Sequence, residues 1–376
     1  MKVHEEVFLS LVRNSLWDTQ VEVPVEFKDW NLVMRLAEIQ AMQGFVAKGL
    51  LDSPAIIARM KPGAESRLSN MLMTNVVMHS MTNSSLKKIV MALHDADIEC
   101  VLLKGQGLAT NYPQPEVREC GDIDLYVGVE NYNKAYQAIK HVADKIDDPT
   151  VLENGGKHFH AVLSGISVEI HKFTEVLSSE SLNKVYQKYE VEGLTQNLVE
   201  LEVGENKVMT PSDNFNAFYI FNHLWSHFLT NGCGIRQLCD WTMFLHTRGE
   251  HIDRKYLHKV LTDMDLISPW QTFGCVVVDI LGLPSAEFPF YDRKYRKNAV
   301  RVFERILLEG DMGRETEFIR NGNRGYLFEK YISAKFYIKR FFFLSGIFPS
   351  HAVQQLTHSI CNGFGRLIKD FTRKIR

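Results

Sequence analysis

The chain has little of what would place it outside the cytoplasm. None of its six cysteines lies in a Cys-x-x-Cys pair, so we expect free thiols in a reducing compartment. The longest aromatic stretch, Phe341–Phe348, is far shorter than the roughly 20 apolar residues that cross a bilayer. The first residues lack the hydrophobic region of a signal peptide. A cytoplasmic protein with no transmembrane segment is therefore expected.

A strong charge of either sign is also missing. The net charge is −2 over 376 residues, whereas proteins that capture nucleic acid electrostatically are usually strongly basic, so nucleic acid is a disfavoured partner. Hydrophobic residues make up 45% of the chain, enough to bury a substantial core, and the length indicates two or three domains.

Two carboxylates stand one residue apart in an apolar, β-branched run. Asp122 and Asp124 belong to Gly121-Asp122-Ile123-Asp124-Leu125-Tyr126-Val127, which has the composition of a strand. Side chains at i and i+2 of a strand point to the same face. Two like charges held this closely are unfavourable unless a cation lies between them, and Mg²⁺ prefers such oxygen ligands.

A strand, a glycine turn and a short helix precede this pair. Residues 98–103 are apolar except for Glu99 and run directly into Lys104 and Gly105, with Gly107 two residues further on. Glycine at a strand-to-helix turn lets the backbone approach a phosphate closely. Arg118 follows, four residues before the first carboxylate. This order of features favours an anion site beside a metal site.

A β-hairpin supplies a third carboxylate. Residues 158–163 and 166–171 are two strand-like runs joined by Ser164-Gly165. In the second run Glu169 shares one face with Ser167 and His171, so this strand is expected to line a cleft. Three carboxylates on neighbouring strands can hold two metal ions for an in-line phosphoryl displacement.

Helical patterning surrounds this α/β segment. We expect helices from the N-cap Asp29 to about Val46, over 68–95, over 131–146 and from 211 onward, with a strand–turn–strand unit within 193–207. The organisation is therefore an N-terminal helical region over 1–95, an α/β domain over 96–210 and a C-terminal helical domain over 211–376.

These motifs resemble the nucleotidyltransferase superfamily with the DNA-polymerase-β-like fold, and most closely its bacterial nucleotidyltransferase family 5 branch. The likeness covers roughly residues 96–175 and rests on Leu103-Lys104-Gly105, Arg118, Asp122-Ile123-Asp124-Leu125 and Val168-Glu169-Ile170-His171. It extends to His223-x-x-x-His227, Gly234-Ile235-Arg236-x-x-x-Asp240 and Phe348-Pro349-Ser350. The resemblance implies an α+β fold in which a small polymerase-β-like domain is flanked by helical regions.

The resemblance also implies a reaction and its site. A nucleoside monophosphate would pass from an NTP, ATP by default, to an acceptor, and pyrophosphate would leave. Two Mg²⁺ ions, or Mn²⁺ in their place, would be held by Asp122, Asp124 and Glu169, the last of which could instead act as base. The phosphates would contact the phosphate-turn and arginine positions Lys104, Gly105, Gly107 and Arg118. Gly105-Gln106 stands where well-studied members of the superfamily have Gly-Gly or Gly-Ser, a feature shared with this branch, which leaves nucleotide choice and turnover open.

The histidines admit several interpretations. His160 or His171 could orient a catalytic carboxylate, while His158, His160, Glu169 and His171 together could compose a zinc site. A zinc site would use Glu169 as a ligand, and we favour instead the use of Glu169 together with Asp122 and Asp124. His223 and His227 share a helix face, and packing or a contribution to the cleft is favoured there.

Arg236 and Asp240 are also four residues apart, so they could form an ion pair on one helix face. Arg236 could instead point into the cleft and bind the triphosphate.

The acceptor is left open by the sequence: a small molecule, a glycan or a protein all fit. Two other classes compete with the enzyme: a catalytically silent nucleotide-binding protein, and an antitoxin-like interaction protein whose helical regions bind a partner. Basic residues around Phe341–Phe348 and in the tail at Lys369, Arg373, Lys374 and Arg376 admit a peripheral membrane contact. A core-facing helix is the favoured interpretation of that stretch.

Overall fold

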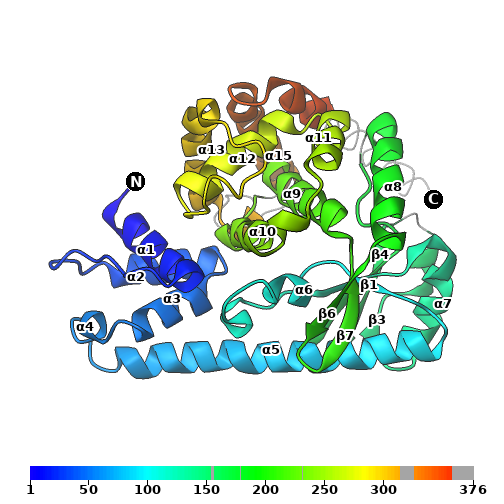
Figure 1. Cartoon of the computed structure of the whole chain (residues 1–376), viewed down its shortest axis with the longest axis horizontal. Coiled ribbons are helices and arrows are strands. Elements are labelled where there is room, and N and C mark those ends of the chain that lie inside the picture. Colours follow the sequence, from blue (N-terminus) through cyan, green and yellow to red (C-terminus); the bar gives the residue numbers. More distant parts are fainter. Residues whose placement is uncertain (154–155, 178, 231, 314–325, 358–376) are drawn as a thin grey trace.

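The computed structural model describes residues 1–153, 156–177, 179–230, 232–313 and 326–357, and it has the α+β architecture expected from the sequence (Figure 1). Its single seven-stranded sheet is mixed, in the order β3-β4-β5-β2-β1-β7-β6. The strands are β1 (Val101–Leu102), β2 (Ile123–Tyr126), β3 (Lys145–Ile146), β4 (His158–Leu163), β5 (Ile166–His171), β6 (Val199–Val203) and β7 (Asn206–Thr210).

Helices precede, cover and follow this sheet. Before and within the α/β segment they are α1 (Val3–Trp17), α2 (Trp30–Ile39), α3 (Gln43–Leu51), α4 (Pro54–Ile57), α5 (Ala64–Asp95), α6 (Gln106–Ala109), α7 (Gly128–Lys140) and α8 (Glu180–Thr195). After it come α9 (Asp213–Leu229), α10 (Ile235–Arg248), α11 (Arg254–Asp263), α12 (Ile267–Asp279), α13 (Arg296–Glu309) and α15 (Tyr326–Ser345). Short 3₁₀ turns are η1 (Pro115–Val117), η2 (Pro149–Leu152), η3 (Gly249–His251), η4 (Arg293–Tyr295) and η5 (Asp311–Gly313).

The pairing of β2 with β5 decides which side chains share a face. These strands run parallel, with Asp124 opposite Glu169, while β4 and β5 form the expected antiparallel hairpin with His158 opposite His171. Ser164 and Gly165 at its turn have φ of 53° and 78°, and a type I′ turn needs positive φ at both positions. The polar residues of β2, β4 and β5 therefore project from one face of the sheet.

The opposite face of the sheet is apolar and covered. Alternate residues of the same three strands, such as Leu125, Phe159 and Ile170, are fully buried in one hydrophobic cluster. The helices that cover them are α7 and the C-terminal half of α5, which contributes Leu86 and Leu93. Helix α5 runs along the base of the molecule from the N-terminal helices to the sheet (Figure 1).

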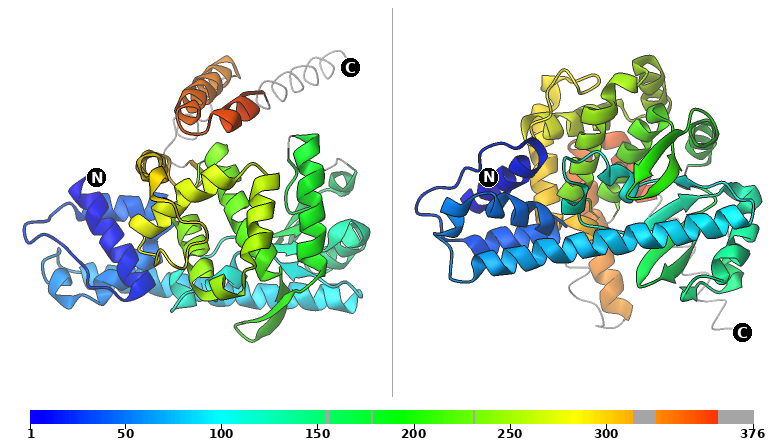
Figure 2. Two further views of the ribbon diagram at one scale, coloured as in Figure 1. Left: turned by 45° about the horizontal axis from the view of Figure 1, so that its top comes forward. Right: turned by 60° about the horizontal axis from the view of Figure 1, so that its bottom comes forward.

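A second hydrophobic cluster joins the N-terminal and C-terminal helices. It contains side chains from α1 and α3 together with side chains from α9, α10, α12 and α13. Figure 2 shows the N-terminal helices beside this C-terminal group in both views. The helical regions thus bury their apolar faces partly against each other, and the domain boundaries at 95 and 210 stay predictions.

The prediction of one continuous helix from Asp29 to Val46 is wrong. The chain forms α2 and α3 instead, separated at Ala41, whose φ is 53°. The buried side chain of Gln40 donates to the carbonyl of Ile306 at 3.0 Å and accepts from the Ile235 amide at 2.9 Å. These distant partners end α2, and a pattern within the helix could not reveal them.

The aromatic stretch near the C-terminus packs mainly into the core. Leu344, Ile347 and Phe348 are buried in the cluster of the helical regions, whereas Phe342 is 69% exposed. No helix among the described residues is long and apolar enough to cross a membrane. The basic tail from Lys369 to Arg376, like Cys361, lies outside the described residues; the five other cysteines are free thiols.

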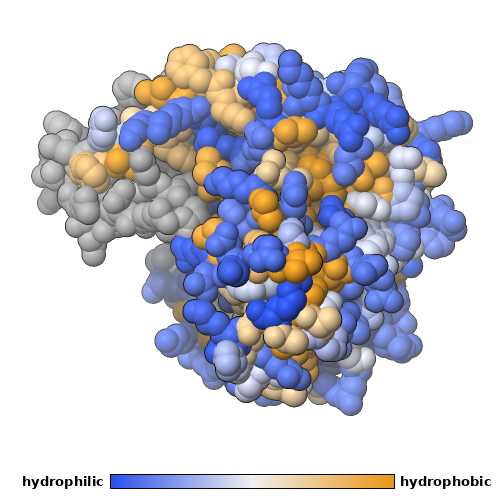
Figure 3. Space-filling view, turned by 90° about the vertical axis from the view of Figure 1, so that its left-hand side faces the viewer, coloured by the Kyte–Doolittle hydropathy of each residue, from blue (hydrophilic) through white to orange (hydrophobic). Residues whose placement is uncertain are grey.

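The surface at the N-terminal side is mostly hydrophilic. Figure 3 shows this face with hydrophobic residues scattered among hydrophilic ones. Such mixing is ordinary for a surface whose large apolar residues have been buried elsewhere.

Replacing Phe159 by alanine tests the cluster that supports the sheet. Its ring packs against those of Tyr132 and Tyr136, with centroids 5.3 and 5.2 Å away. We expect Phe159→Ala to lower the free energy of unfolding by about 3–5 kcal/mol, measured by urea denaturation. Val129→Ala, at a 56% exposed position, should change it by less than about 0.5 kcal/mol. Equal effects of the two changes would contradict this assignment of the core.

Candidate active site

Three carboxylates meet on the polar face of the sheet. Asp122 immediately precedes β2, Asp124 lies within it, and Glu169 lies opposite Asp124 on β5. One oxygen from each of the three lies within 4.8 Å of the others. The structure therefore brings together the three acidic residues singled out from the sequence.

Two cationic groups contact the most buried of these carboxylates. Lys104 Nζ lies 3.1 Å from Asp124 Oδ1, and His171 Nε2 lies 3.0 Å from the same oxygen. Burial opposes ionisation of Asp124, but Lys104 and His171 outweigh it and lower the pKa of this carboxyl. Burial also opposes the charge on Lys104, yet Asp124 and its acidic neighbours raise the pKa of the amine. Both groups are charged at neutral pH.

The other two carboxylates titrate differently. Burial and then the neighbouring Asp124 raise the pKa of Asp122, which shows that its negative charge is poorly compensated. Burial would raise the pKa of Glu169 as well, but the hydrogen bond from His171, with Nε2 at 3.2 Å from Oε2, lowers it. A poorly compensated carboxylate beside two ionised ones is the situation in which a bound cation is favourable.

The phosphate turn is built as expected at only one of its two glycines. Gly105 has φ 57°, and a Cβ there would lie 3.0 Å from the carbonyl oxygen of Asp122, so this position needs glycine. Gly107 is buried within α6, where a Cβ would meet the side chains of Leu102 and Thr210. Gly107 therefore packs α6 against the sheet and does not face the carboxylates.

Arg118 lies near the three carboxylates, as the motif implied, but its guanidinium is already paired within the protein. It is 2% exposed, and its Nε and Nη2 atoms donate to the two oxygens of Asp240 at 2.6 and 2.9 Å. Tyr112 donates its hydroxyl to Asp240 at 2.7 Å. This buried pair joins the segment before β2 to α10. Its guanidinium is thus engaged in the protein interior.

Of the two alternatives for Arg236, an ion pair with Asp240 is wrong, because Asp240 pairs with Arg118. Arg236 instead has Nη2 3.5 Å from Asp311 Oδ2, on η5 of the C-terminal region. A Cβ on Gly121 would lie 3.8 Å from its Nη1, so the guanidinium lies beside the loop that carries Asp122. Its Nε is buried and has no hydrogen-bond partner among the described residues. Both arginines lie near the carboxylates, and Arg236 is the less fully engaged of the two among the described residues.

A second polar network, which includes His223 and His227 of α9, lies beside the carboxylates. Glu175 accepts a hydrogen bond from Lys157 Nζ at 3.2 Å, and its other oxygen lies 3.3 Å from His223 Nδ1. His223 Nε2 in turn lies 3.0 Å from His227 Nε2 and 3.5 Å from Lys104 Nζ. Burial opposes ionisation of Glu175, but His223 and Lys157 lower its pKa to about 2. Lys157 and Glu175 were not predicted as site residues, because they lie just outside the hairpin strands and belong to no recognisable motif.

His158 and His160 lie at the edge of the same polar face. His158 Nδ1 is 3.3 Å from Glu169 Oε2, and its Nε2 is 3.0 Å from His160 Nε2. Burial lowers the pKa of His158 to about 4, so its ring is neutral at physiological pH. His160 is half exposed, with Nδ1 3.5 Å from Glu169 Oε1.

These residues surround a cleft of about 430 Å³, called here the carboxylate cleft. It is lined by the predicted residues Lys104, Gly105, Arg118, Asp122, Asp124, Glu169, His223 and Arg236, and also by Lys157, His158 and His227. Gly107, His160 and His171 do not line it. Among the described residues, no phenylalanine, tyrosine or tryptophan lines it either, so it offers no such platform for a base to stack upon.

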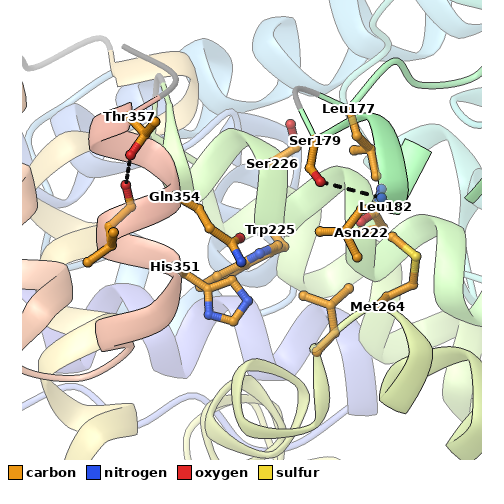
Figure 4. A pocket seen from close by; sticks show the side chains of 12 residues that line it. Leu177, Ser179, Leu182, Asn222, Trp225, Ser226, Met264, His351, Gln354 and Thr357 are labelled. Carbon is orange, nitrogen blue, oxygen red and sulfur yellow. Dashed lines mark hydrogen bonds between the residues drawn. The ribbon is translucent and has the colours of Figure 1, made fainter. Parts of the chain in front are cut away.

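A second cavity, of about 390 Å³, lies between α8, α9 and the helical segment at 349–357 (Figure 4). Trp225 and His351 meet there with ring centroids 5.1 Å apart. Its described lining holds no carboxylate, lysine or arginine. The groups for metal and phosphate chemistry are therefore concentrated in the carboxylate cleft.

Comparison with known proteins gives one result. The sequence profile of an uncharacterised nucleotidyltransferase family matches residues 27–278, which is well over half of the chain. No curated protein and no solved structure gives a significant match. The match includes the sheet, α9 and α10, and so all the residues of the carboxylate cleft except Asp311.

Mutation of Asp240 tests the interior placement of Arg118. We expect Asp240→Ala to lower the free energy of unfolding by about 3–5 kcal/mol, because it leaves a buried guanidinium unpaired. The double variant Arg118→Met/Asp240→Leu should recover most of this loss. Glu180→Ala, which removes an 85% exposed partner of Lys184, is the control and should cost less than about 0.5 kcal/mol in the same urea titration. If Asp240→Ala were as mild as the control, Arg118 would not depend on this partner.

Proposed function

Since the chain belongs to this nucleotidyltransferase family, we propose that it transfers a nucleoside monophosphate from an NTP to an acceptor with release of pyrophosphate. The observation that carries the proposal is the convergence of Asp122, Asp124 and Glu169 on one face of the sheet. The carboxylate cleft is the proposed site.

The donor set fits divalent magnesium. Three carboxylates offer the hard oxygen ligands that Mg²⁺ prefers, and Mn²⁺ accepts the same set. The raised pKa of Asp122 supports this fit, since its charge is not balanced by protein groups alone. When bound, the ions would neutralise phosphate oxygens and stabilise the charge that develops during displacement at the α-phosphorus.

Cationic side chains that line the cleft are proposed to hold the triphosphate. Lys104, Lys157 and Arg236 line the cleft, and the last of these has a buried Nε without a partner among the described residues. Gly105 lets the backbone of the turn lie close to that of Asp122, within the same cleft. This assignment replaces Arg118 by Arg236 and leaves Gly107 with a packing role.

Glu169 is proposed as a ligand more than as a base. A carboxylate whose pKa is lowered by a hydrogen bond from His171 is a weak proton acceptor at neutral pH. His171 is a positioning residue in this scheme, because it contacts both Asp124 and Glu169 from the buried side. His223 is proposed to orient Lys104 in the same way, from α9.

The proposals for the donor base and the acceptor rest on general grounds. The described lining of the cleft has no aromatic side chain on which a particular base would stack, so ATP is proposed as the donor by default. The near-neutral charge of the chain favours a small molecule, a glycan or a protein over a nucleic acid as acceptor. We propose that the reaction takes place in the cytoplasm.

Calorimetric titration with each of the four NTPs, with and without Mg²⁺, tests the proposal. We expect binding of at least one NTP to require Mg²⁺, because the phosphates and the carboxylates would otherwise repel each other. Asp122→Asn should weaken this binding by at least about tenfold, or roughly 1.4 kcal/mol.

The matched control is Asp95→Asn, an 80% exposed carboxylate at the end of α5, which should leave binding unchanged. Absence of Mg²⁺-dependent binding to the wild type, or equal binding by Asp122→Asn, would contradict the proposed site. Binding without turnover on any acceptor would favour a silent nucleotide-binding protein.

A further inference from the structure

The β4–β5 hairpin carries a second cluster of ligating side chains next to the three carboxylates. His158 and His171 are directly opposite each other across the hairpin, with ring centroids 4.9 Å apart. Glu169 lies on the same face, two residues before His171. One ligand atom from each of these three residues lies within 4.8 Å of the others.

We propose that His158, Glu169 and His171 form a separate metal position, selective for a borderline divalent transition-metal ion of the Zn²⁺ type. It differs in chemistry from the all-oxygen group of Asp122, Asp124 and Glu169, with which it shares one residue. Imidazole nitrogens suit such ions, whereas Mg²⁺ prefers oxygen. The inference concerns metal binding alone and does not depend on the transfer reaction.

The distances from Glu169 to the two histidines match those of a tetrahedral site. Glu169 Oε2 lies 3.3 Å from His158 Nδ1 and 3.2 Å from His171 Nε2. Bonds of about 2.0–2.1 Å to a tetrahedral zinc ion separate its ligand atoms by about 3.3–3.4 Å. The three side chains therefore need little movement to reach a common ion.

The far nitrogen of each imidazole has a hydrogen-bond partner that can orient the ring. His171 Nδ1 lies 3.3 Å from the carbonyl oxygen of Phe173, and His158 Nε2 lies 3.0 Å from His160 Nε2. With a proton on each far nitrogen, the near nitrogens would supply the lone pairs in the metal-bound state. Such outer partners orient the rings of metal ligands.

The near nitrogens both face Glu169, but they differ in how the protein satisfies them. His158 Nδ1 is buried and makes no hydrogen bond among the described residues, although Glu169 is close. His171 Nε2 faces oxygens of two carboxylates, since Asp124 Oδ1 lies 3.0 Å from it. Metal binding would release the proton that His171 Nε2 shares with these carboxylates, and a water molecule would complete the four ligands.

Titration with Co²⁺, which replaces Zn²⁺ and absorbs strongly in the visible range when four-coordinate, tests the proposal. The untagged full chain, without nucleotide, should bind a single equivalent with a four-coordinate spectrum, and Zn²⁺ should displace it. His158→Ala should weaken binding more than about 100-fold, and His160→Ala about 10–100-fold, the usual loss on removing an outer partner.

Two controls separate this position from the all-oxygen site. His94→Ala, at an 89% exposed side chain, should bind Co²⁺ like the wild type. Asp122→Asn should also keep its Co²⁺ spectrum, even though it is expected to lose Mg²⁺-dependent nucleotide binding. A failure of the proposed function would thus appear in the nucleotide titration and not in the Co²⁺ titration.

Three results would overturn the inference: a weak six-coordinate spectrum, unchanged binding by His158→Ala, or loss of Co²⁺ binding in Asp122→Asn. If circular dichroism showed His158→Ala to be unfolded, His158→Gln would replace it, with the same expected loss of the spectrum.

Discussion

The parallel pairing of β2 with β5 is the constraint on which the rest of the site depends. It sets Asp124 opposite Glu169, on the face of the sheet turned away from the apolar cluster under α5 and α7. Shifting this register by one residue would exchange the polar and apolar faces of a strand, so burial of Leu125 and Ile170 specifies where the carboxylates point. The charges are thus positioned by hydrophobic packing on the other side of the same strands. Lys104 and His171 contact Asp124 and so reduce the electrostatic repulsion between the carboxylates.

The helices contribute to the site through a few long-range polar contacts. Arg118 and Asp240 join the segment before β2 to α10, and Gln40 joins the end of α2 to α10 and α13. Both contacts are buried, where an unpaired polar group would cost considerable free energy. They hold α10 beside the loop of Asp122, and so bring Arg236 to the cleft. The N-terminal helices therefore support the cleft through α10, although they supply only Ala41 to its described lining.

How much could be predicted from the sequence depended on the range of the interaction. The carboxylates and the hairpin were found because a period of two along a strand is a local signal, and the turn at Ser164-Gly165 is one as well. The pairing of Arg118 with Asp240 was not predicted, because the two residues are distant along the chain and only the fold brings them together. Likewise α2 ends where Gln40 meets residues of α10 and α13. Lys157 and Glu175 belong to no motif, and their closeness to His223 comes from the packing of α9.

Acidic and basic side chains lie close together in the carboxylate cleft, and this restricts what can occupy it. The sheet presents three acidic side chains, while Lys104, Lys157 and Arg236 line the cleft as cations. Each of these cations is paired with a carboxylate of the protein: Lys104 with Asp124, Lys157 with Glu175 and Arg236 with Asp311. A ligand with only negative charge would be repelled by the three carboxylates of the sheet, whereas a metal–phosphate complex would offer its cation to them and its phosphate oxygens to the amino and guanidinium groups. This match of charge requires no contact with a base, in keeping with a described lining that has no aromatic platform.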